Sequence, residues 1–334
     1  MSSDATSPRN IPDRLDRPVA AALRSWEMLL LVVAVGVFIF NSLASPHFLD
    51  AWTLSDMTYN FTEKALIALP MALLIISGEI DLSVAALLAL SSTMMGFAMQ
   101  FGLGTPMLVG TGIVVGLLCG ALNGALVTGL GLPSIVVTIG TMSLFRGIAF
   151  IILGDQVYKN YPKGFDYFGQ GYVGWVISFE LVLFVLFALV FGFLLHFTTF
   201  GRKLYFIGRN PVSAAFSGVN VRRMKMILFC LTGVMSGVAS VLLTSRLGST
   251  RPSIAQGLEL EAITMVVLGG VAITGGAGTI PGVVLAALIM GMVTFGFGLL
   301  NVPGIVMSIF VGFLLIAVIA LPILWKRLSG GLGR

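Results

Sequence analysis

The chain is poor in charged residues and in the side chains that build metal or catalytic sites. Only 10% of its 334 residues are Asp, Glu, Lys or Arg, whereas a soluble domain carries about 25%. Two histidines are too few for a metal cluster, and the two cysteines, Cys119 and Cys230, stand singly in apolar segments. The composition excludes a soluble domain, and the sequence predicts neither a metal site nor a disulfide framework.

Enzyme motifs are also absent. The sequence has no Gly-x-x-x-x-Gly-Lys phosphate loop, no Gly-x-Ser-x-Gly and no His-Glu-x-x-His. We therefore expect a protein that is not an enzyme, needs no cofactor and cannot hydrolyse ATP itself. If it drives uphill transport, the energy has to come from a partner or from an ion gradient.

Long apolar runs fill the rest of the chain, which is 57% hydrophobic. They exceed the ~10 residues of a barrel strand and approach the ~20 residues of a membrane helix. We predict an all-α polytopic membrane bundle of about eight to ten transmembrane helices, with external loops at 45–60 and 154–174. The predicted spans are 26–44, 61–77, 84–99, 107–130, 134–153, 176–197, 226–247, 261–272, 283–300 and 305–325. The first is predicted to be a span rather than a signal peptide, because a polar leader precedes a long apolar run.

The basic residues predict the orientation of these spans. Residues 199–225 hold six of the 19 Lys and Arg and no acid, and such short basic loops stay on the cytoplasmic side. We expect both termini there too, so the net charge of +5 reflects topology rather than nucleic-acid binding. The predicted organisation is a flexible cytoplasmic segment at 1–25, one membrane domain at 26–327 and a tail at 328–334.

Within this basic loop, Asn210 and Pro211 predict a helix start. Asn is a good N-cap, and Pro at the first helical position loses no needed N–H. Residues 211–217 could form two turns that end at Gly218 in a left-handed conformation. So short a helix is unstable alone and needs a docking partner, whose groove could close over the small Ala214, Ala215 and Gly218. The alternative is an ordinary basic loop at the membrane surface.

Two polar interruptions fall close to membrane depth. Glu79, Asp81 and Ser83 belong to a Gly-flanked break at 78–83. A charge at this depth normally faces the bundle or a water-filled cavity, which predicts a gate or a cavity lining. The alternative is a tight cytoplasmic turn whose acids face solvent or stabilise the start of the next helix.

A second glycine-rich stretch resembles the first. It contains Gly269, Gly270, Gly275 and Gly276, and so many glycines allow broken or re-entrant backbone where it is buried in protein. The segments ISGEIDLSVAALLAL and TGGAGTIPGVVLAAL indicate an internal duplication, a common feature of transporters.

A few polar side chains lie inside the predicted spans. Arg146 is the lone cation well within a span, and it could pair with Glu180 or Asp81 or contact a substrate. The others are explained by hydrogen bonds between helices: Asn123, Thr138 and Thr141.

Four motifs together resemble the permease subunits of bacterial ABC importers of the ribose, autoinducer-2 and rhamnose type. They are SGEIDLSV at 77–84, PSIVVTIGTMSLFRGIAF at 133–150, GRKLYFIGRNPVSAAFSGVNV at 201–221 and VVLGGVAITGGAGTIPG at 266–282. The resemblance extends over nearly the whole chain, and it implies a multi-pass protein of the bacterial inner membrane.

The resemblance also implies partners and roles. The short cytoplasmic helix would sit in a groove of an ABC ATPase with two nucleotide-binding halves. A periplasmic sugar-binding protein would dock outside, and a second permease, identical or related, would complete a lipid-embedded pathway. The coupling residues would be Gly208, Arg209, Asn210, Pro211, Ala214, Ala215 and Gly218.

The candidate pathway or gate residues are Glu79, Asp81, Ser83, Asn123, Thr138, Thr141, Arg146, Gly269, Gly270, Gly275 and Gly276. The solute expected from the resemblance is rhamnose, ribose, a related sugar or autoinducer-2. A branched-chain amino-acid permease and an ion-coupled secondary transporter are the alternatives. The secondary transporter is disfavoured because its acids should group at the membrane midplane.

Overall fold

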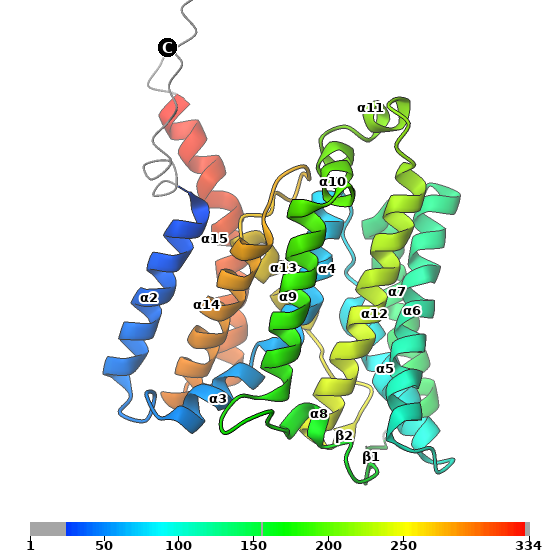
Figure 1. Ribbon diagram of the computed structural model, residues 1–334, viewed down its shortest axis with the longest axis vertical. Helices are drawn as coiled ribbons and strands as arrows, with labels where there is room; N and C mark the ends of the chain where they lie inside the picture. The colour runs from blue at the N-terminus through cyan, green and yellow to red at the C-terminus, as the bar shows by residue number, and fades with distance from the viewer. Residues whose placement is uncertain (1–24, 155, 331–334) are drawn as a thin grey trace, which may run out of the picture.

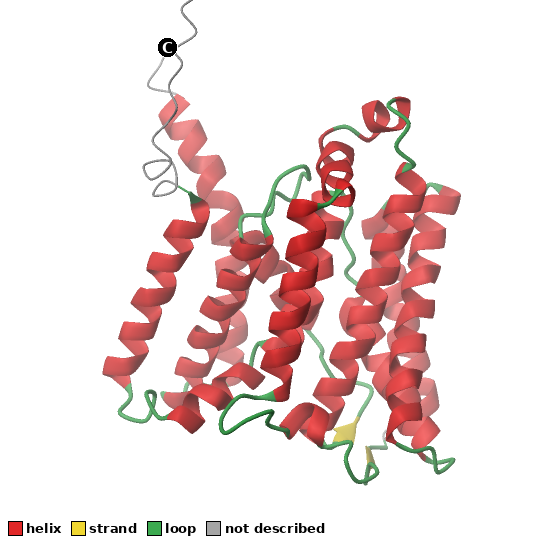
Figure 2. Ribbon diagram, viewed as in Figure 1, coloured by secondary structure: helices red, strands yellow, loops and turns green. Residues whose placement is uncertain are grey.

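The computed structural model describes residues 25–154 and 156–330, which form a bundle of helices (Figures 1 and 2). The predicted N-terminal segment, except residue 25, and the last four residues of the predicted tail lie outside this range. The long helices are α2 (Trp26–Ala44), α4 (Thr62–Ile76), α5 (Val84–Met99), α6 (Thr105–Leu130), α7 (Ser134–Leu153), α9 (Phe179–Phe197), α12 (Val221–Leu247), α14 (Ile280–Leu299) and α15 (Gly304–Gly330). The last helix therefore continues past residue 328, where a tail was predicted.

Length and apolar character allow six of the described helices to cross a membrane, namely α2, α6, α7, α9, α12 and α14. A seventh span is possible if α3 (Ala51–Tyr59) and α4, which bend by 48° at their junction, count as one. Two shorter apolar helices are α5 and the part of α15 from Gly304 to Ala320. The polytopic helical bundle is confirmed. Helix α13 (Leu258–Leu268), predicted as a short span, has only 11 residues.

The centre of the bundle is α4, which is buried along almost its whole length. It packs against α12, α13, α9 and α14. A helix that is apolar all round has no face to present to water, so it is stable only when surrounded. Helix α4 is therefore the element around which the other helices pack.

Glycines bring the backbones of α6 and α12 into close contact. Gly116 and Gly120 face Gly233, and an added β-carbon at Gly116 would lie 2.3 Å from the carbonyl oxygen of Gly233. A one-turn spacing of small residues lets two backbones approach within a membrane, where packing rather than the hydrophobic effect drives helix association. The glycine-rich composition of the fourth predicted span thus has a packing role.

The lower end of the bundle in Figure 1 carries structure where loops were predicted. Residues 45–60 contain α3, whose N-cap Asp50 accepts hydrogen bonds from the N–H groups of Trp52 and Thr53. The predicted loop at 154–174 contains β1 (Tyr158–Lys159) and α8 (Tyr167–Gln170). Strand β1 pairs antiparallel with β2 (Ser249–Thr250), so the end is closed by short elements.

The upper end carries α10 (Thr199–Arg209) and α11 (Pro211–Phe216). The prediction of an irregular basic loop before α11 is wrong, because α10 is a regular amphipathic helix. It buries Gly201, Leu204 and Ile207 and exposes Arg202 and Lys203. The apolar positions recur every three residues, so one stripe of the helix packs on the bundle while its charges face outward. The start of α2 and the end of α15 lie at this same end of the bundle (Figure 1).

Candidate functional site

Helix α11 stands beyond the membrane body and is defined by its caps. The side-chain oxygen of Asn210 accepts a hydrogen bond of 2.9 Å from the N–H of Ser213, and Pro211 occupies the first turn. Gly218 has a φ of +83°, which few other residues adopt without strain. The predicted helix and its caps are confirmed, except that it ends one residue earlier, at Phe216.

The outward face of α11 is apolar. Val212 is 62% exposed and Phe216 is 89% exposed, and Ala215 is also exposed. Ala214, expected to meet a partner, is fully buried within this chain. This part of the docking prediction is wrong, because the inner face of the short helix packs against the chain's own α10 and α12. The surface open to a partner includes the apolar Val212, Ala215 and Phe216, with the exposed Ser213 and Ser217 beside them.

Three chain segments meet at Gly208, one turn before α11. An added β-carbon there would lie 1.9 Å from the carbonyl oxygen of Ile76 and 2.4 Å from the nitrogen of Gly276. The N–H of Gly276 donates a hydrogen bond of 2.9 Å to the same Ile76 oxygen. Gly275 lies against Gly78. The two glycine-rich breaks predicted from the sequence are therefore in direct contact, and α10 packs on both.

The other two candidate glycines of the second break have packing roles. An added β-carbon at Gly269 would lie 2.7 Å from the backbone of Val283 on α14, and at Gly270 it would lie 2.5 Å from the ring of Trp26. Trp26 also donates a hydrogen bond from Nε1 to the carbonyl oxygen of Leu268. These glycines let α2 and α14 close on the end of α13.

Asp81, Ser83 and Asn123 form a buried polar chain at the first break. Ser83 donates to Asp81 Oδ1 from its N–H at 2.8 Å and from its hydroxyl at 2.6 Å. Asn123 on α6 donates from Nδ2 to the Ser83 hydroxyl oxygen at 2.8 Å. All three are fully buried, and Asp81 Oδ2 and Asn123 Oδ1 have no hydrogen-bond partner among the described residues. The alternative of a solvent-facing turn is wrong for Asp81.

Glu79 forms an ion pair with Lys225 near the start of α12, and both side chains are largely buried. The pair links the break after α4 to the basic segment that carries α11. Glu79 is thus paired rather than free to face solvent.

Arg146 has different partners from those expected. It donates two hydrogen bonds of 2.7 Å from Nη1, one to the carbonyl oxygen of Pro252 and one to that of Ile254. The predicted pairing with Glu180 or Asp81 is wrong, because carbonyl groups of the segment between β2 and α13 satisfy the guanidinium. Arg146 therefore fastens α7 to that segment.

The two threonines of α7 hydrogen-bond within their own helix. Thr138 donates to the carbonyl oxygen of Ser134 at 2.8 Å, and Thr141 donates to that of Thr138 at 3.4 Å. Within the described part of the chain, neither side chain makes the predicted interhelical hydrogen bond. Asn123, in contrast, does bridge two segments.

Two further ion pairs lie at the opposite end of the bundle, and the sequence analysis did not foresee them. Arg246 on α12 holds Glu63 on α4 through two hydrogen bonds, at 2.8 and 2.9 Å. Lys64 pairs with Glu261 on α13 at 2.5 Å. Glu180 on α9 is buried, and neither carboxylate oxygen has a hydrogen-bond partner among the described residues. Charged residues near the ends of predicted spans were the sequence feature that could have indicated these contacts.

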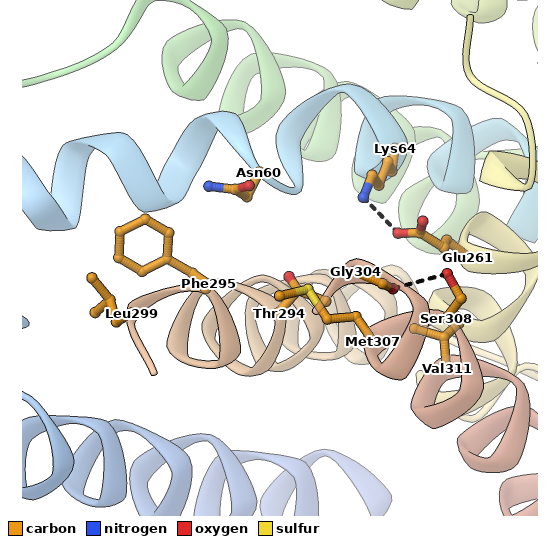
Figure 3. A pocket seen from close by; sticks show the side chains of 11 residues that line it. Asn60, Lys64, Glu261, Thr294, Phe295, Leu299, Gly304, Met307, Ser308 and Val311 are labelled. Atoms are coloured by element: carbon orange, nitrogen blue, oxygen red, sulfur yellow. Dashed lines mark hydrogen bonds and ion pairs between the residues drawn. The ribbon is translucent and has the colours of Figure 1, made fainter. Parts of the chain in front are cut away.

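The Lys64–Glu261 pair borders a cavity of about 430 Å³ between α4, α13, α14 and α15. Figure 3 shows the two side chains pointing toward each other at one end of this cavity, with Asn60, Thr294 and Ser308 along it. A second cavity of about 280 Å³ lies on the other side of the pair and is lined by Glu63, Arg246 and Gln256. Among the described residues, no three His, Cys, Asp or Glu side chains are grouped as metal ligands.

The chain belongs to the family described as the permease component of branched-chain amino acid transport systems, whose profile matches residues 53–319. It is similar to the autoinducer 2 import system permease protein LsrD of Enterobacter sp. strain 638, at 34% identity over 88% of this chain and 92% of the relative.

Two other relatives are comparable. The LsrD protein of Yersinia enterocolitica is 35% identical over 88% of this chain and 90% of the relative. The L-arabinose ABC transporter permease protein AraH of Azospirillum brasilense is 34% identical over 91% of this chain and 90% of the relative. No solved structure was found to match the chain.

Family membership has direct consequences. The chain is a transport component rather than an enzyme, and it is a multi-pass protein of the inner membrane. It belongs to an ABC transport system that includes an ATPase and a periplasmic binding protein. The resemblance drawn from the four sequence motifs is confirmed at this level.

Proposed function

We propose that this chain forms the translocation pathway for a monosaccharide-type solute, such as ribose, rhamnose, arabinose or autoinducer-2. The names of the relatives support this proposal, because they specify autoinducer-2 import and L-arabinose transport. The solute would arrive on a periplasmic sugar-binding protein. A second permease, identical or related, would complete the pathway.

The observation that carries the proposal is the apolar outer face of α11. A helix of six residues cannot persist alone in water, yet α11 displays Val212 and Phe216 outside the membrane body. Exposed aromatic and aliphatic side chains on a small rigid element are typical anchors of protein interfaces. We assign this face to the groove of an ABC ATPase with two nucleotide-binding halves.

The contacts of Gly208 give this docking a mechanical consequence. The backbone of α10 packs without side chains on the ends of both glycine-rich breaks, at Ile76 and Gly276. A displacement of α11 by the ATPase would therefore move α10 against these breaks. The Glu79–Lys225 pair adds a second connection from the same segment to the first break. Both breaks would act as the gate.

The orientation follows from charge. Residues 199–225 lie at the same end of the bundle as the start of α2 and the end of α15 (Figure 1). Lys and Arg are concentrated in this segment and favour the cytoplasmic side. The end with α3, α8 and the β1–β2 pair would then face the periplasm and receive the binding protein.

Uptake by proteoliposomes tests the function. The chain would be reconstituted with the ATPase and binding protein of its own system and offered ribose, rhamnose, L-arabinose, autoinducer-2 and leucine. We expect ATP-dependent uptake of a sugar or of autoinducer-2. Uptake of leucine alone would favour the branched-chain alternative that the family description names. Accumulation on a proton or sodium gradient without the ATPase would contradict the proposal.

A variant of α11 tests the coupling role. Phe216→Glu should lower ATP-driven uptake by about 30-fold or more, since losing a central interface anchor costs about 2 kcal/mol or more. Membrane insertion should be unchanged because Phe216 is exposed. Leu132→Glu is the matched control, because Leu132 is also exposed in a turn at the same end of the bundle (Figure 1). Equal uptake by the two variants would refute the coupling role.

A further inference from the structure

Two neighbouring cavities, together named the outer tract, meet at the Lys64–Glu261 pair. Both cavities have Lys64 and Glu261 in their walls, and the first measures about 430 Å³. Small-molecule pockets in proteins typically enclose about 300–1,000 Å³. The tract is therefore large enough for one small solute.

Its place in the fold suits a solute that enters from outside. The first cavity lies near the junction of α3 and α4, where α14 ends and α15 begins. This end of the bundle is opposite α11 (Figure 1). In the proposed orientation it is the periplasmic end, where a binding protein would release its cargo.

The ion pair keeps unused hydrogen-bonding capacity. The side chains of Lys64 and Glu261 are 22% and 28% exposed. An ammonium group has three donors and a carboxylate has about four acceptor positions, and among the described residues each side chain shows only the one hydrogen bond that joins them. Two donors and one free carboxylate oxygen thus remain for a ligand in the cavity.

The remaining walls add neutral polar groups. Asn60 contributes an amide at one end of the cavity, and Ser308 and Thr294 contribute hydroxyl oxygens (Figure 3). Both hydroxyl groups donate to carbonyl oxygens of their own helices, so their lone pairs can accept. Phe295 and Met307 supply apolar surface beside them. The cavity wall thus offers hydrogen-bond donors and acceptors beside apolar surface, and its two charges are paired with each other. These features fit a neutral solute that carries several hydroxyl groups.

We propose that this tract is the outer solute-binding vestibule of the permease and that Lys64 and Glu261 hydrogen-bond the hydroxyl groups of the solute. The proposal rests on the function proposed above and names residues that select the solute class. A purely structural role for the ion pair, as a link between α4 and α13, is the competing explanation.

A charge swap separates these two roles. Lys64→Glu combined with Glu261→Lys keeps the attraction between the helices but exchanges donors and acceptors. We expect the swap to retain a wild-type thermal midpoint but to raise the KM for uptake by about tenfold, the effect of losing about 1.4 kcal/mol of solute contacts. The probe is the member of the sugar panel that the wild-type assembly imports. A wild-type KM in a stably folded swap variant would overturn the proposal.

Cysteine labelling covers the case in which the swap does not fold. In a background with Cys119→Ala and Cys230→Ala, Ser308→Cys would be treated from outside with a membrane-impermeant methanethiosulfonate. We expect uptake to fall by about tenfold and the imported sugar to slow the labelling. Gln100→Cys is the control, because Gln100 is exposed at the same end of the bundle and lines neither cavity. If labelling changes uptake equally at both positions, and the sugar slows it equally, the vestibule proposal is overturned.

These outcomes are distinct from failure of the proposed function. If the wild-type assembly imports no sugar, the function itself fails before any variant is compared. If it imports a sugar and both tests fail, only the vestibule is wrong.

Discussion

Gly208 lies so close to the carbonyl oxygen of Ile76 that an added β-carbon would stand 1.9 Å from it. No side chain can occupy that space without moving backbone, because the nitrogen of Gly276 lies on the same side. The contact makes the end of α10 and the end of the central helix α4 one packed unit.

Gly208→Ala should therefore disrupt the protein strongly. Overpacking against backbone costs about 1–3 kcal/mol and occasionally more, and here the obstacles are main-chain atoms of two segments. We expect a clearly lower thermal midpoint and at least a tenfold loss of ATP-driven uptake. Gly131→Asn is the control, since Gly131 has a φ of +71° and open space around its α-carbon and Asn tolerates a positive φ. A normal thermal midpoint for Gly208→Ala would contradict the close packing.

The glycine contact of α6 and α12 gives a second prediction. Gly116→Ala and Gly120→Ala should each destabilise the protein by about 1–3 kcal/mol, because their β-carbons would meet backbone atoms of α12 at 2.3 and 2.4 Å. Gly129→Ala on the same helix meets nothing within 4 Å and should be neutral or slightly stabilising. Thermal unfolding of the purified protein in detergent is the measurement. Equal midpoints for Gly116→Ala and Gly129→Ala would show that the helices are not in close contact.

The Glu63–Arg246 pair predicts a large loss of stability when one partner is removed and a partial recovery when the other is neutralised as well. Arg246→Met leaves the Glu63 carboxylate buried without its bidentate partner, and removing one member of a buried pair costs about 3–5 kcal/mol. Adding Glu63→Gln removes the unpaired charge and should recover part of the lost stability. The thermal midpoints of the two single variants and the double variant form the required cycle. Additive losses would mean that the two side chains do not interact.

The Glu79–Lys225 pair should matter more for uptake than for folding. Lys225→Met breaks the link between α12 and the first break, so we expect several-fold slower ATP-driven uptake. The free energy of unfolding should fall by about 1–3 kcal/mol, because this largely buried pair is intermediate between exposed and fully buried ion pairs. Lys203→Met is the matched control, because Lys203 is exposed on the same basic segment and has no ion pair among the described residues. If both variants transport equally, the pair has no role in coupling.

The features of the fold that depend on neighbouring residues could be predicted from the sequence. Asn210, Pro211 and Gly218 act within one or two helical turns, so the caps of α11 were predictable. The long spans follow from apolar length alone. Helix α10 was missed because Arg202 and Lys203 interrupt its apolar stripe of Gly201, Leu204 and Ile207.

Contacts between distant segments could not be predicted in this way. Glu63 and Arg246 are 183 residues apart, and nothing near either residue specifies the other. Arg146 was expected to seek a carboxylate, but carbonyl oxygens at Pro252 and Ile254 satisfy it. Charge alone predicts that a buried cation needs acceptors, and only the packing of helices decides which ones it finds.

Helix α2 lies at the margin of the bundle and packs chiefly on α14, and the family match begins only after it, at residue 53. Three hydrogen bonds hold it to the bundle: Trp26 donates to the Leu268 carbonyl oxygen, Asn41 donates to that of Met292, and Glu27 accepts from the Thr279 hydroxyl. Without this one extra crossing, the chain would enter the bundle from the opposite side of the bilayer. This outer helix thus decides at which end of the bundle the described part of the chain begins.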